Sequence, residues 1–416
     1  MPINADMPNR DVTDTPVVDT TRPASNPTGL MLEPILEQVG APSSVPIAIQ
    51  NARWHMNDKQ VNSVMFRQMD MLYTTRKVPK SGQPSALDYQ LAPLDFTYEM
   101  GGETLTPEEF LDRTYTNAMM IIKQGKVVYE KYHNHSTPDT KFMGWSMTKS
   151  ITSILIGIAV EDGLIQSIEQ DITEYLPELK PGAYNGVTIK QILEMRSGVD
   201  YVESYDFHTM SVASKNHIEA LIKNVVRFVD VAKTIGRSSQ PGKVFAYKTI
   251  DTAVLGLLIE RVSGTNISNY MAEKLWEPLG AEQDGFFIMD GEPGVGREFS
   301  GAGFNASLRD FARIGQMILN KGRVNGKQIV PEQWVLDSAR PAGDESEPID
   351  YGYQWWTFSK TPAFSAIGLQ GQFIFVDPST ETVIVKLSYF PLDVDENLLH
   401  EETVRFFMTA SHWQAQ

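Results

Sequence analysis

The chain has 416 residues, of which 42% are hydrophobic and 21% charged, as in ordinary globular proteins. Its 36 basic and 52 acidic side chains give a net charge of −16, which argues against general nucleic-acid binding because that requires a basic surface. The chain contains no cysteine, which excludes disulfides, thiolate metal sites and cysteine nucleophiles. It has no apolar stretch long enough to span a membrane, and residues 1–26 lack the pattern of a secretory signal, so we expect a cytoplasmic protein.

Two β-hairpins are predicted, one on each side of the middle of the chain. Apolar runs between residues 118 and 132 flank Gln124-Gly125, and the glycine supplies the positive φ that a tight turn needs. Nearer the carboxyl end, the runs FIFVDP and TVIVKLSYF flank a Pro-Ser-Thr turn. The first 45 residues contain many prolines and few periodic apolar positions, so we expect an irregular leader there.

The middle of the chain is predicted to be mostly helical. In SMTKSITSILIGIAVEDG, apolar residues recur at helical spacing from Ile151 to Ile158, and Gly163 lies where a left-handed C-terminal cap is expected. A later helix begins with the capping pair Ser307 and Asp310. The segment that contains this capping pair is SLRDFARIGQMILNKG. The other helical segments are TIKQILEM, TAVLGLLIERVSG and ENLLHEETVRFFMTASHW.

This order of elements predicts an α/β (α+β) fold. An antiparallel sheet built from both chain ends is flanked by helices and carries an inserted, mostly helical lobe. We predict a leader over residues 1–45 and a catalytic domain over residues 46–416. The sheet lobe of that domain comprises about residues 46–145 and 300–416, and the helical lobe comprises about residues 146–299.

The one Ser-x-x-Lys of the chain, Ser146 to Lys149, opens the first predicted helix. Free backbone amides at a helix N-terminus can stabilise a developing oxyanion. The spacing puts the lysine amine on the same helix face as the serine, one turn further along. A partly desolvated lysine can lose its proton and act as a base toward the serine. The alternative interpretation is an N-capping serine followed by an exposed lysine.

Other catalytic arrangements fit the sequence less well. Ser146 is preceded by Gly144 but lacks the second glycine of a G-x-S-x-G elbow. The seven histidines form no recognisable Ser-His-Asp order. His133 and His135 alternate along an expected strand and so face one side of it, but further metal ligands at a suitable spacing are missing. We therefore expect neither a metal nor an organic cofactor.

Longer segments around these residues resemble a known superfamily. FMGWSMTKSITSILIGIAVEDGLI, EYLPEL and TIKQILEMRSGVDY are similar to the opening of the active-site lobe in class C β-lactamase-like serine hydrolases. PGKVFAYKTIDTAVLGLLIERVSG resembles the second motif of this penicillin-recognising superfamily, and GLQGQFIFVDP stands in the place of the third. The resemblance runs from about Ala118 to Phe407, and it implies that the predicted fold is the serine β-lactamase-like one. Within the superfamily, the chain most resembles 6-aminohexanoate-dimer (nylon oligomer) hydrolases, which are relatives of the family VIII carboxylesterases.

This resemblance implies roles for particular residues. Ser146 would be the nucleophile, Lys149 its general base, and Tyr247 a proton shuttle to the leaving group. A phenol near an ammonium has its charged form favoured, so we expect Tyr247 to exchange protons near neutral pH. The main-chain amides of Ser146 and of Leu369 or Gln370 would hold the oxyanion. Taken alone, Tyr247 also fits an interior tyrosine with a bonded hydroxyl.

Two departures from the superfamily motifs bear on the substrate. The chain has YKT (residues 247–249) where penicillin-binding enzymes often carry Tyr-x-Asn, and GLQG (residues 368–371) where they carry Lys-Thr-Gly. The missing lysine normally helps to hold a substrate carboxylate, and the missing asparagine helps to orient an amide. Both changes argue against efficient β-lactam hydrolysis and favour neutral acyl substrates. Lys248 would be either a cation in the cleft or a solvated loop lysine.

Candidate substrate contacts follow from the same comparison. The four residues expected to bind substrate are Tyr201, Tyr205, Gly368 and Gly371. The two tyrosines follow a helix end and could wall the cleft, although loop aromatics also serve as plain packing. Trp145 and the pair Trp355-Trp356 are expected to pack in the core.

The sequence therefore predicts a serine hydrolase, of the carboxylesterase or 6-aminohexanoate-dimer-hydrolase type, that cleaves a small ester or linear amide through an acyl-enzyme. Two alternatives stay open: β-lactamase or D-amino-acid peptidase activity, and a catalytically idle relative that binds a ligand. The expected partner is a small acyl compound, with no nucleic acid and no membrane. A homodimer is compatible with this interpretation.

Overall fold

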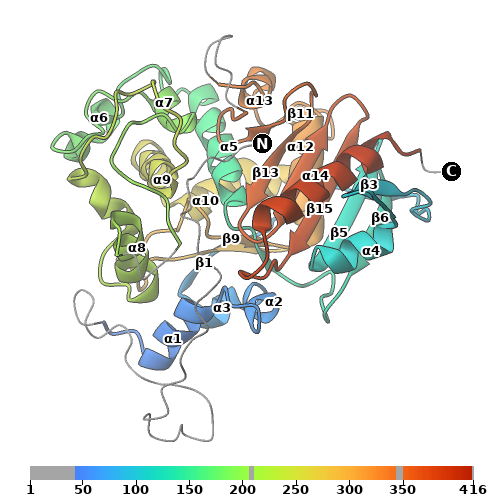
Figure 1. Cartoon of the computed structure of the whole chain (residues 1–416). Coiled ribbons are helices and arrows are strands. Elements are labelled where there is room, and N and C mark those ends of the chain that lie inside the picture. The colour runs from blue at the N-terminus through green and yellow to red at the C-terminus, as the bar shows by residue number, and fades with distance from the viewer. Residues whose placement is uncertain (1–42, 206–209, 343–349, 415–416) are drawn as a thin grey trace, which may run out of the picture.

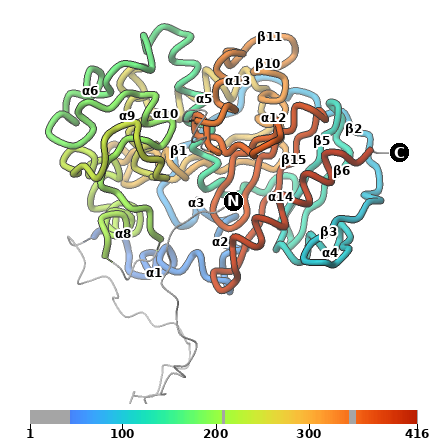
Figure 2. The backbone as a smooth tube through the Cα atoms, turned by 45° about the horizontal axis from the view of Figure 1, so that its top comes forward, coloured from blue at the N-terminus to red at the C-terminus, as the bar shows by residue number. Residues whose placement is uncertain are grey.

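The computed structural model describes residues 43–205, 210–342 and 350–414, so the predicted leader lies almost entirely outside the described residues. Helices α6 to α9 gather on one side of the molecule, and a large sheet with α14 and α4 lies on the other (Figure 1). Figure 2 shows the segment with α1 to α3 running along the base, next to α8. The helices of this base segment are α1 (Ile47–His55), α2 (Asn62–Met65) and α3 (Met69–Leu72).

A seven-stranded sheet forms the body of one side of the molecule. Its strands, in order across the sheet, are β12 (Trp356–Thr357), β13 (Phe364–Gly368), β14 (Gln372–Asp377), β15 (Thr382–Ser388), β5 (Thr116–Lys123), β6 (Lys126–Tyr132) and β2 (Asp88–Tyr89). Neighbouring strands pair antiparallel except β2 and β6, which are parallel. Because β15 pairs with β5, both parts of the chain build one sheet, as predicted.

Both predicted hairpins are confirmed. Gln124 and Gly125 join β5 to β6 with φ angles of 49° and 77°, which is the left-handed conformation that a tight hairpin turn requires. The second hairpin consists of β14 and β15. Its side chains alternate between two cores: Phe373 and Phe375 pack on one face of the sheet, and Ile374 packs on the other.

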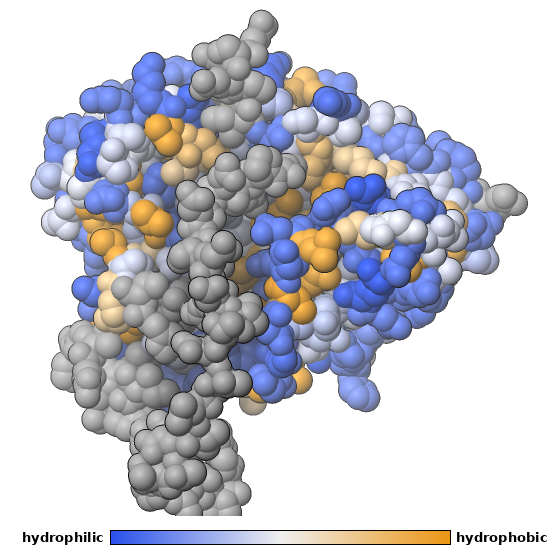
Figure 3. Space-filling view, in the orientation of Figure 1, coloured by the Kyte–Doolittle hydropathy of each residue, from blue (hydrophilic) through white to orange (hydrophobic). Residues whose placement is uncertain are grey.

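Helices cover both faces of the sheet. The face that carries Phe373 is covered by α4 (Pro107–Arg113) and α14 (Glu396–His412), through residues such as Phe110 and Phe406. The opposite face is covered by α12 (Leu308–Leu319), whose N-cap Ser307 accepts a hydrogen bond from the amide of Asp310, as predicted. Figure 3 shows hydrophilic residues predominating around α4 and β3 at the surface.

The region between the two parts of the sheet is helical, as predicted. Its helices are α5 (Met147–Glu161), α6 (Ile172–Tyr175), η1 (Pro177–Leu179), α7 (Ile189–Leu193), α8 (Val212–His217), η3 (Ile218–Ile222), η4 (Phe228–Lys233), α9 (Thr249–Ser263), α10 (Ile267–Met271), η5 (Ala272–Trp276) and α11 (Glu277–Leu279). Gly163 follows the end of α5 with a φ of 72°, which confirms the predicted left-handed cap. The division of the chain into a leader and two lobes with the stated boundaries remains a proposal.

Smaller elements complete the fold. A four-stranded sheet contains, in order, β1 (Thr75–Val78), β8 (Gly285–Ile288), β9 (Phe304–Ala306) and β7 (Phe142–Met143). The remaining pieces are β3 (Tyr98–Met100), β4 (Glu103–Leu105), β10 (Arg323–Val324), β11 (Lys327–Gln328) and α13 (Glu332–Ser338). Because β7 leads directly into α5 and pairs with β9, this small sheet fixes where α5 begins.

The prediction that His133 and His135 share one face of a strand is wrong. Strand β6 ends at Tyr132, and Asn134 and His135 have φ angles of 52° and 61°, so the chain turns there instead of staying extended. Among the described residues, no group of three or more His, Asp or Glu is placed to hold a metal ion. In the same residues, no helix has the length and apolar character needed to cross a membrane.

The contact between α12 and the sheet gives a stability prediction. A Cβ on Gly315 would lie 2.6 Å from Val383 Cγ1 and 3.0 Å from Ile374 Cγ2, so the Gly315→Val side chain must push the helix off the sheet. We expect a loss of about 2 kcal/mol in the free energy of unfolding, measured by chemical denaturation. Gln316→Val, on the half-exposed side of the same helix, is the matched control; equal stability of the two variants would contradict this packing.

Candidate active site

Ser146 lies at the junction between β7 and α5, where the chain turns sharply. The preceding Trp145 has a φ of 47°, a strained conformation for a bulky residue, and its ring packs edge-on against Phe66 at 5.3 Å between centroids. The Gly144 amide donates to the Phe304 carbonyl of β9 at 2.9 Å, which ties the turn to the small sheet. Ser146 occupies the N-cap position of α5.

The side chain of Ser146 does not cap the helix. Its hydroxyl instead accepts a hydrogen bond from Lys149 Nζ at 3.0 Å. The same ammonium donates to Thr249 Oγ1 at 3.0 Å and to the Gly301 carbonyl at 2.9 Å. Lys149 is only 1% exposed. The alternative of a capping serine followed by an exposed lysine is therefore wrong.

The burial of Lys149 has a consequence for its proton. Burial lowers the pKa of Lys149 to about 8, because a charged amine loses its hydration inside the protein, and the nearby negative charge of Glu203 partly opposes this shift. A value close to neutrality means that an appreciable fraction of Lys149 is a neutral amine at slightly alkaline pH. A neutral amine at this place can accept a proton.

Only one of the three partners of Lys149 can give it a proton. The Gly301 carbonyl is purely an acceptor. The Thr249 hydroxyl donates its own proton to Glu203 Oε1 at 2.9 Å, while the Thr249 amide donates to Glu203 Oε2 at 2.6 Å. The hydroxyl of Ser146 therefore holds the proton that is free to move to Lys149.

Tyr247 completes the cluster from the loop before α9. Its side chain hydrogen-bonds to Ser146, and its ring centroid lies 4.9 Å from Lys149 Nζ. The ring stacks on Trp356, with centroids 5.5 Å apart, and stands edge-on to Tyr351. Burial raises the pKa of Tyr247 well above its usual range. The expected proton exchange near neutral pH is wrong, because loss of hydration outweighs the nearby ammonium, and the phenol keeps its proton.

The turn between β13 and β14, residues 368–371, faces the start of α5. A Cβ on Gly368 would lie 2.4 Å from the Gly144 carbonyl oxygen, so only glycine allows this close approach. Gln370 has a φ of 56°, and its amide donates to Glu396 Oε1 at 2.9 Å. Because that amide already has an acceptor, the amide of Leu369 is the better-placed of the two oxyanion candidates.

Side chains hold this turn in one shape. The Gln370 side chain donates to the Asn57 carbonyl at 3.0 Å, which joins the turn to the base segment. The Gln372 side chain donates to the carbonyls of Leu369 and Gln370 at 3.2 and 3.1 Å. Gly371 has a φ of 89°, and a Cβ there would lie 2.4 Å from the Phe390 ring. The two glycines of the turn thus serve backbone shape and close packing.

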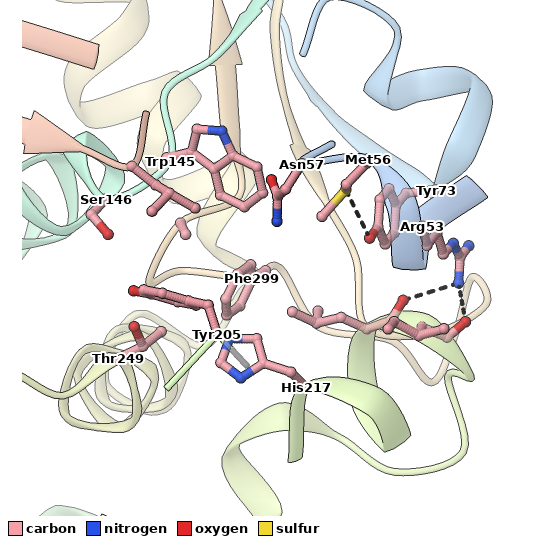
Figure 4. A pocket seen from close by; sticks show the side chains of 14 residues that line it. Arg53, Met56, Asn57, Tyr73, Trp145, Ser146, Tyr205, His217, Thr249 and Phe299 are labelled. Carbon is pink, nitrogen blue, oxygen red and sulfur yellow. Dashed lines mark hydrogen bonds between the residues drawn. The ribbon is translucent and has the colours of Figure 1, made fainter. Parts of the chain in front are cut away.

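A cavity opens beside Ser146 (Figure 4). Most of its lining is apolar, including Met56, Leu221, Ile222, Phe299, Ala302 and Leu369. Its other lining residues include Tyr205, Thr249, Trp145 and His217. Residues from the base segment, the helical region and the turn after β13 thus enclose one space.

The sequence-predicted residues divide into two groups. Ser146, Lys149 and Tyr247 form one cluster, and of these Ser146 lines the cavity together with Tyr205. Gly368 and Gly371, predicted to bind substrate, lie in the turn whose Leu369 lines the cavity but are not lining residues themselves. Tyr201 is instead 2% exposed and packs in the main core, outside the cavity lining. Of the tryptophans expected in the core, Trp355 is buried, Trp356 is half-buried against Tyr247, and Trp145 is buried but also lines the cavity.

Lys248 fits neither of its two expected environments. It is 3% exposed, so it is not a solvated loop lysine, and it is not among the residues that line the cavity. Its Nζ donates to the Ala246 carbonyl at 3.2 Å, and burial lowers its pKa although the nearby charge of Asp251 opposes this shift. Thr249, one residue later, is the residue of this segment that contacts Lys149 and lines the cavity.

The residues in or beside the cavity that were not found from the sequence include Thr249 and Arg53, which line it, and Glu203, which contacts Thr249. Thr249 stands third in the Tyr-Lys-Thr segment, so the departure from Tyr-x-Asn was itself the signal for a substitute partner of Lys149. No local sequence pattern marks Glu203 or Arg53 as a site residue, because an acidic residue in a loop and an arginine in a helix are usually found at the surface. Their positions depend on contacts across the chain, such as the bonds from Thr249 to Glu203.

Comparison with known proteins decides the family. A sequence model of the beta-lactamase family matches residues 108–397. The chain belongs to the beta-lactamase family. A 6-aminohexanoate-dimer hydrolase of Paenarthrobacter ureafaciens is 30% identical over 303 residues, which cover 68% of this chain and 75% of the relative. The predicted resemblance to that group of hydrolases is confirmed.

Solved structures confirm the fold of this beta-lactamase family member. A protein from Bacillus anthracis assigned as a 6-aminohexanoate-dimer hydrolase is 24% identical, with a TM-score of 0.76, and the match covers 90% of this chain and 98% of the other. A family VIII carboxylesterase is 17% identical, with a TM-score of 0.54 over 72% of this chain and 94% of the other. These similarities confirm the predicted α/β architecture with its antiparallel sheet and inserted helices.

The contact between Glu203 and the cluster gives a second prediction. Removing the negative charge in Glu203→Gln should lower the pKa of Lys149 below its value of about 8, because that charge stabilises the ammonium through Thr249. The pKa is measured from the Cε chemical shift of Lys149 in lysine-labelled protein, assigned with Lys149→Arg. Glu194→Gln, at a buried glutamate next to Arg196, is the control. A pKa that rises or stays constant in Glu203→Gln would refute this coupling.

Proposed function

We propose that this protein is a serine hydrolase that cleaves esters or linear amides through an acyl-enzyme. Ser146 is the nucleophile, Lys149 the general base and Tyr247 the proton donor to the leaving group. The observation that carries the proposal is the 3.0 Å contact between Ser146 Oγ and the amine of Lys149, whose burial lowers its pKa to about 8. A serine with a base of that pKa in direct contact is an activated nucleophile.

Acylation follows from this arrangement. Neutral Lys149 takes the hydroxyl proton as Ser146 Oγ bonds to the substrate carbonyl carbon, which gives a tetrahedral oxyanion and an ammonium. Tyr247, protonated at neutral pH, donates its proton to the leaving oxygen or nitrogen, and the ammonium of Lys149 returns a proton to the phenolate. The bond to the leaving group breaks, and Ser146 carries the acyl group. Water then attacks the ester with Lys149 again as base, which releases the acid.

The oxyanion is held by backbone amides in this proposal. Among the described residues, no acceptor is recorded for the amide of Ser146, and that amide lies at the positive end of α5. The Leu369 amide is the proposed second donor, because Glu396 holds the Gln370 amide. The bonds that fix residues 368–371 keep these donors in place before the substrate arrives, which is the arrangement that lowers the barrier most.

The substrate class rests on two supports. The relative of Paenarthrobacter ureafaciens is a 6-aminohexanoate-dimer hydrolase, which supports linear amides, and the apolar cavity supports an acyl chain. The third motif lacks the lysine that helps β-lactam enzymes to hold a carboxylate. Esters and linear amides are therefore favoured over β-lactams as substrates.

The nucleophile is tested by turnover of p-nitrophenyl butyrate. Ser146→Ala should reduce kcat by about 10³-fold or more, because no other group can form the acyl-enzyme. Ser153→Ala is the matched control, since this buried hydroxyl in the same helix has no hydrogen-bond partner among the described residues. Undiminished turnover by the Ser146→Ala enzyme would rule out this residue as the nucleophile.

The base is tested by the pH dependence of the same reaction. Since Lys149 must be neutral to accept a proton, kcat/KM should rise with pH and level off above the pKa of about 8. Lys149→Ala should slow turnover by about 10²- to 10⁴-fold and remove this rise, while denaturation shows an intact fold. If kcat/KM of the wild-type enzyme stays constant between about pH 6 and pH 9, the lysine is not the base.

A further inference from the structure

The cavity beside Ser146 has an unusual charge distribution. Among its described lining residues, Arg53 is the only one that carries a charge at neutral pH, and none is an aspartate or glutamate. The remaining titratable lining groups are phenols and His217, and burial lowers the pKa of His217, which keeps its ring neutral. Figure 4 shows Ser146 and Arg53 on opposite sides of the cavity.

Arg53 keeps its charge although it is only 4% exposed. Its Nε donates to the Leu72 carbonyl at 2.8 Å, and its Nη1 donates to the carbonyls of Leu221 and Ile222 and to Asn224 Oδ1, at 2.7 to 3.1 Å. The guanidinium also lies 4.2 Å from the Tyr73 ring centroid. These dipoles and the ring stabilise the cation, and the more distant charge of Glu292 also favours it, although no described carboxylate forms an ion pair with Arg53. A guanidinium stays protonated even when buried.

The carboxylate of Glu203 acts at the end of the cavity beside Ser146, where burial and this charge together raise the pKa of the lining residue Tyr205, and the charge opposes the effect of burial on the pKa of His217. Glu203 lies beyond Thr249, is not a lining residue, and has both oxygens bound by the amide and hydroxyl of Thr249. The N-terminal end of α5 adds partial positive charge at Ser146, and Lys149 adds more when it is protonated. The positive charge of the cavity therefore lies at its far end, where Arg53 is the one charged lining residue among those described.

We propose that the part of the substrate that enters this cavity is neutral or carries a carboxylate, and that Arg53 selects against an ammonium group there. This inference deepens the proposed hydrolase function and rests on it for the role of the cavity. This selection predicts that the free linear 6-aminohexanoate dimer is a poor substrate, because the acyl half of that dimer ends in an ammonium group. An acyl chain with an uncharged or acidic end fits the lining and its charge.

The test uses three ligands of equal chain length and different charge: hexanoate, hexanamide and hexylammonium. Their binding to Ser146→Ala protein is measured by NMR titration, so the result does not depend on turnover. We expect hexanoate to bind at least about tenfold more tightly than hexylammonium, with hexanamide between them, because a cation attracts the first and repels the last. Hexylammonium binding as tightly as hexanoate, or no binding by any of the three, would overturn the proposal.

Two variants assign the preference to Arg53. Arg53→Lys keeps the positive charge and should keep the order of the three affinities, whereas Arg53→Met should bring hexanoate and hexylammonium to within about threefold of each other. An unchanged preference in a folded Arg53→Met protein would refute the role of this residue. If Arg53→Met does not fold, the ligand order in protein with Arg53 intact still decides the charge preference.

Turnover measurements, made beside the ligand titrations, separate this inference from the proposed function. Absence of ester turnover in the protein with Ser146 intact would contradict the hydrolase proposal, whereas the ligand order in Ser146→Ala protein supports or overturns the charge selection whatever the turnover. Conversely, an active enzyme that prefers the free dimer over its N-acetylated form would contradict the charge selection alone. N-acetylation removes the ammonium without changing the scissile amide, so we expect it to raise kcat/KM by about tenfold.

Discussion

The burial of one lysine amine is the constraint on which the rest of the site depends. Lys149 is nearly inaccessible to water, yet its Nζ contacts three oxygens, from Ser146, Thr249 and Gly301. Burial brings its pKa close to neutrality, and the three contacts leave Ser146 as the group that can give it a proton. An exposed lysine in the same sequence motif would stay an ammonium and could not act as a base.

Three distant parts of the chain must meet for this constraint to hold. The small sheet fixes the start of α5 through the pairing of β7 with β9, and the turn at residues 368–371 lies against that start because Gly368 has no side chain. The base segment then closes the cavity and is joined to the same turn by the bond from Gln370 to the Asn57 carbonyl. The site is thus preorganised by backbone contacts, which suits electrostatic stabilisation of a developing oxyanion.

The sequence predicted the fold and the core of the site because both are encoded locally. Alternating apolar residues specify β5 and β14, helical spacing specifies α5, and the Ser-x-x-Lys motif identifies Ser146 and Lys149. What it missed depends on tertiary contacts. The high pKa of Tyr247 follows from burial beside Trp356, and Arg53 reaches the cavity only because α1 packs against η3. Neither contact leaves a periodic or motif-like trace in the chain.

The central claim is that Ser146 forms a covalent acyl intermediate, as a binding protein that merely uses this fold would not. The most direct test is mass spectrometry of the intact protein and its peptides, quenched at intervals after mixing with a slowly hydrolysed acylating ester. The account predicts one added acyl group on the peptide that contains Ser146, which appears within the first turnover and decays as the acid is released. No adduct on that peptide, or an adduct at another residue while turnover proceeds, would contradict it.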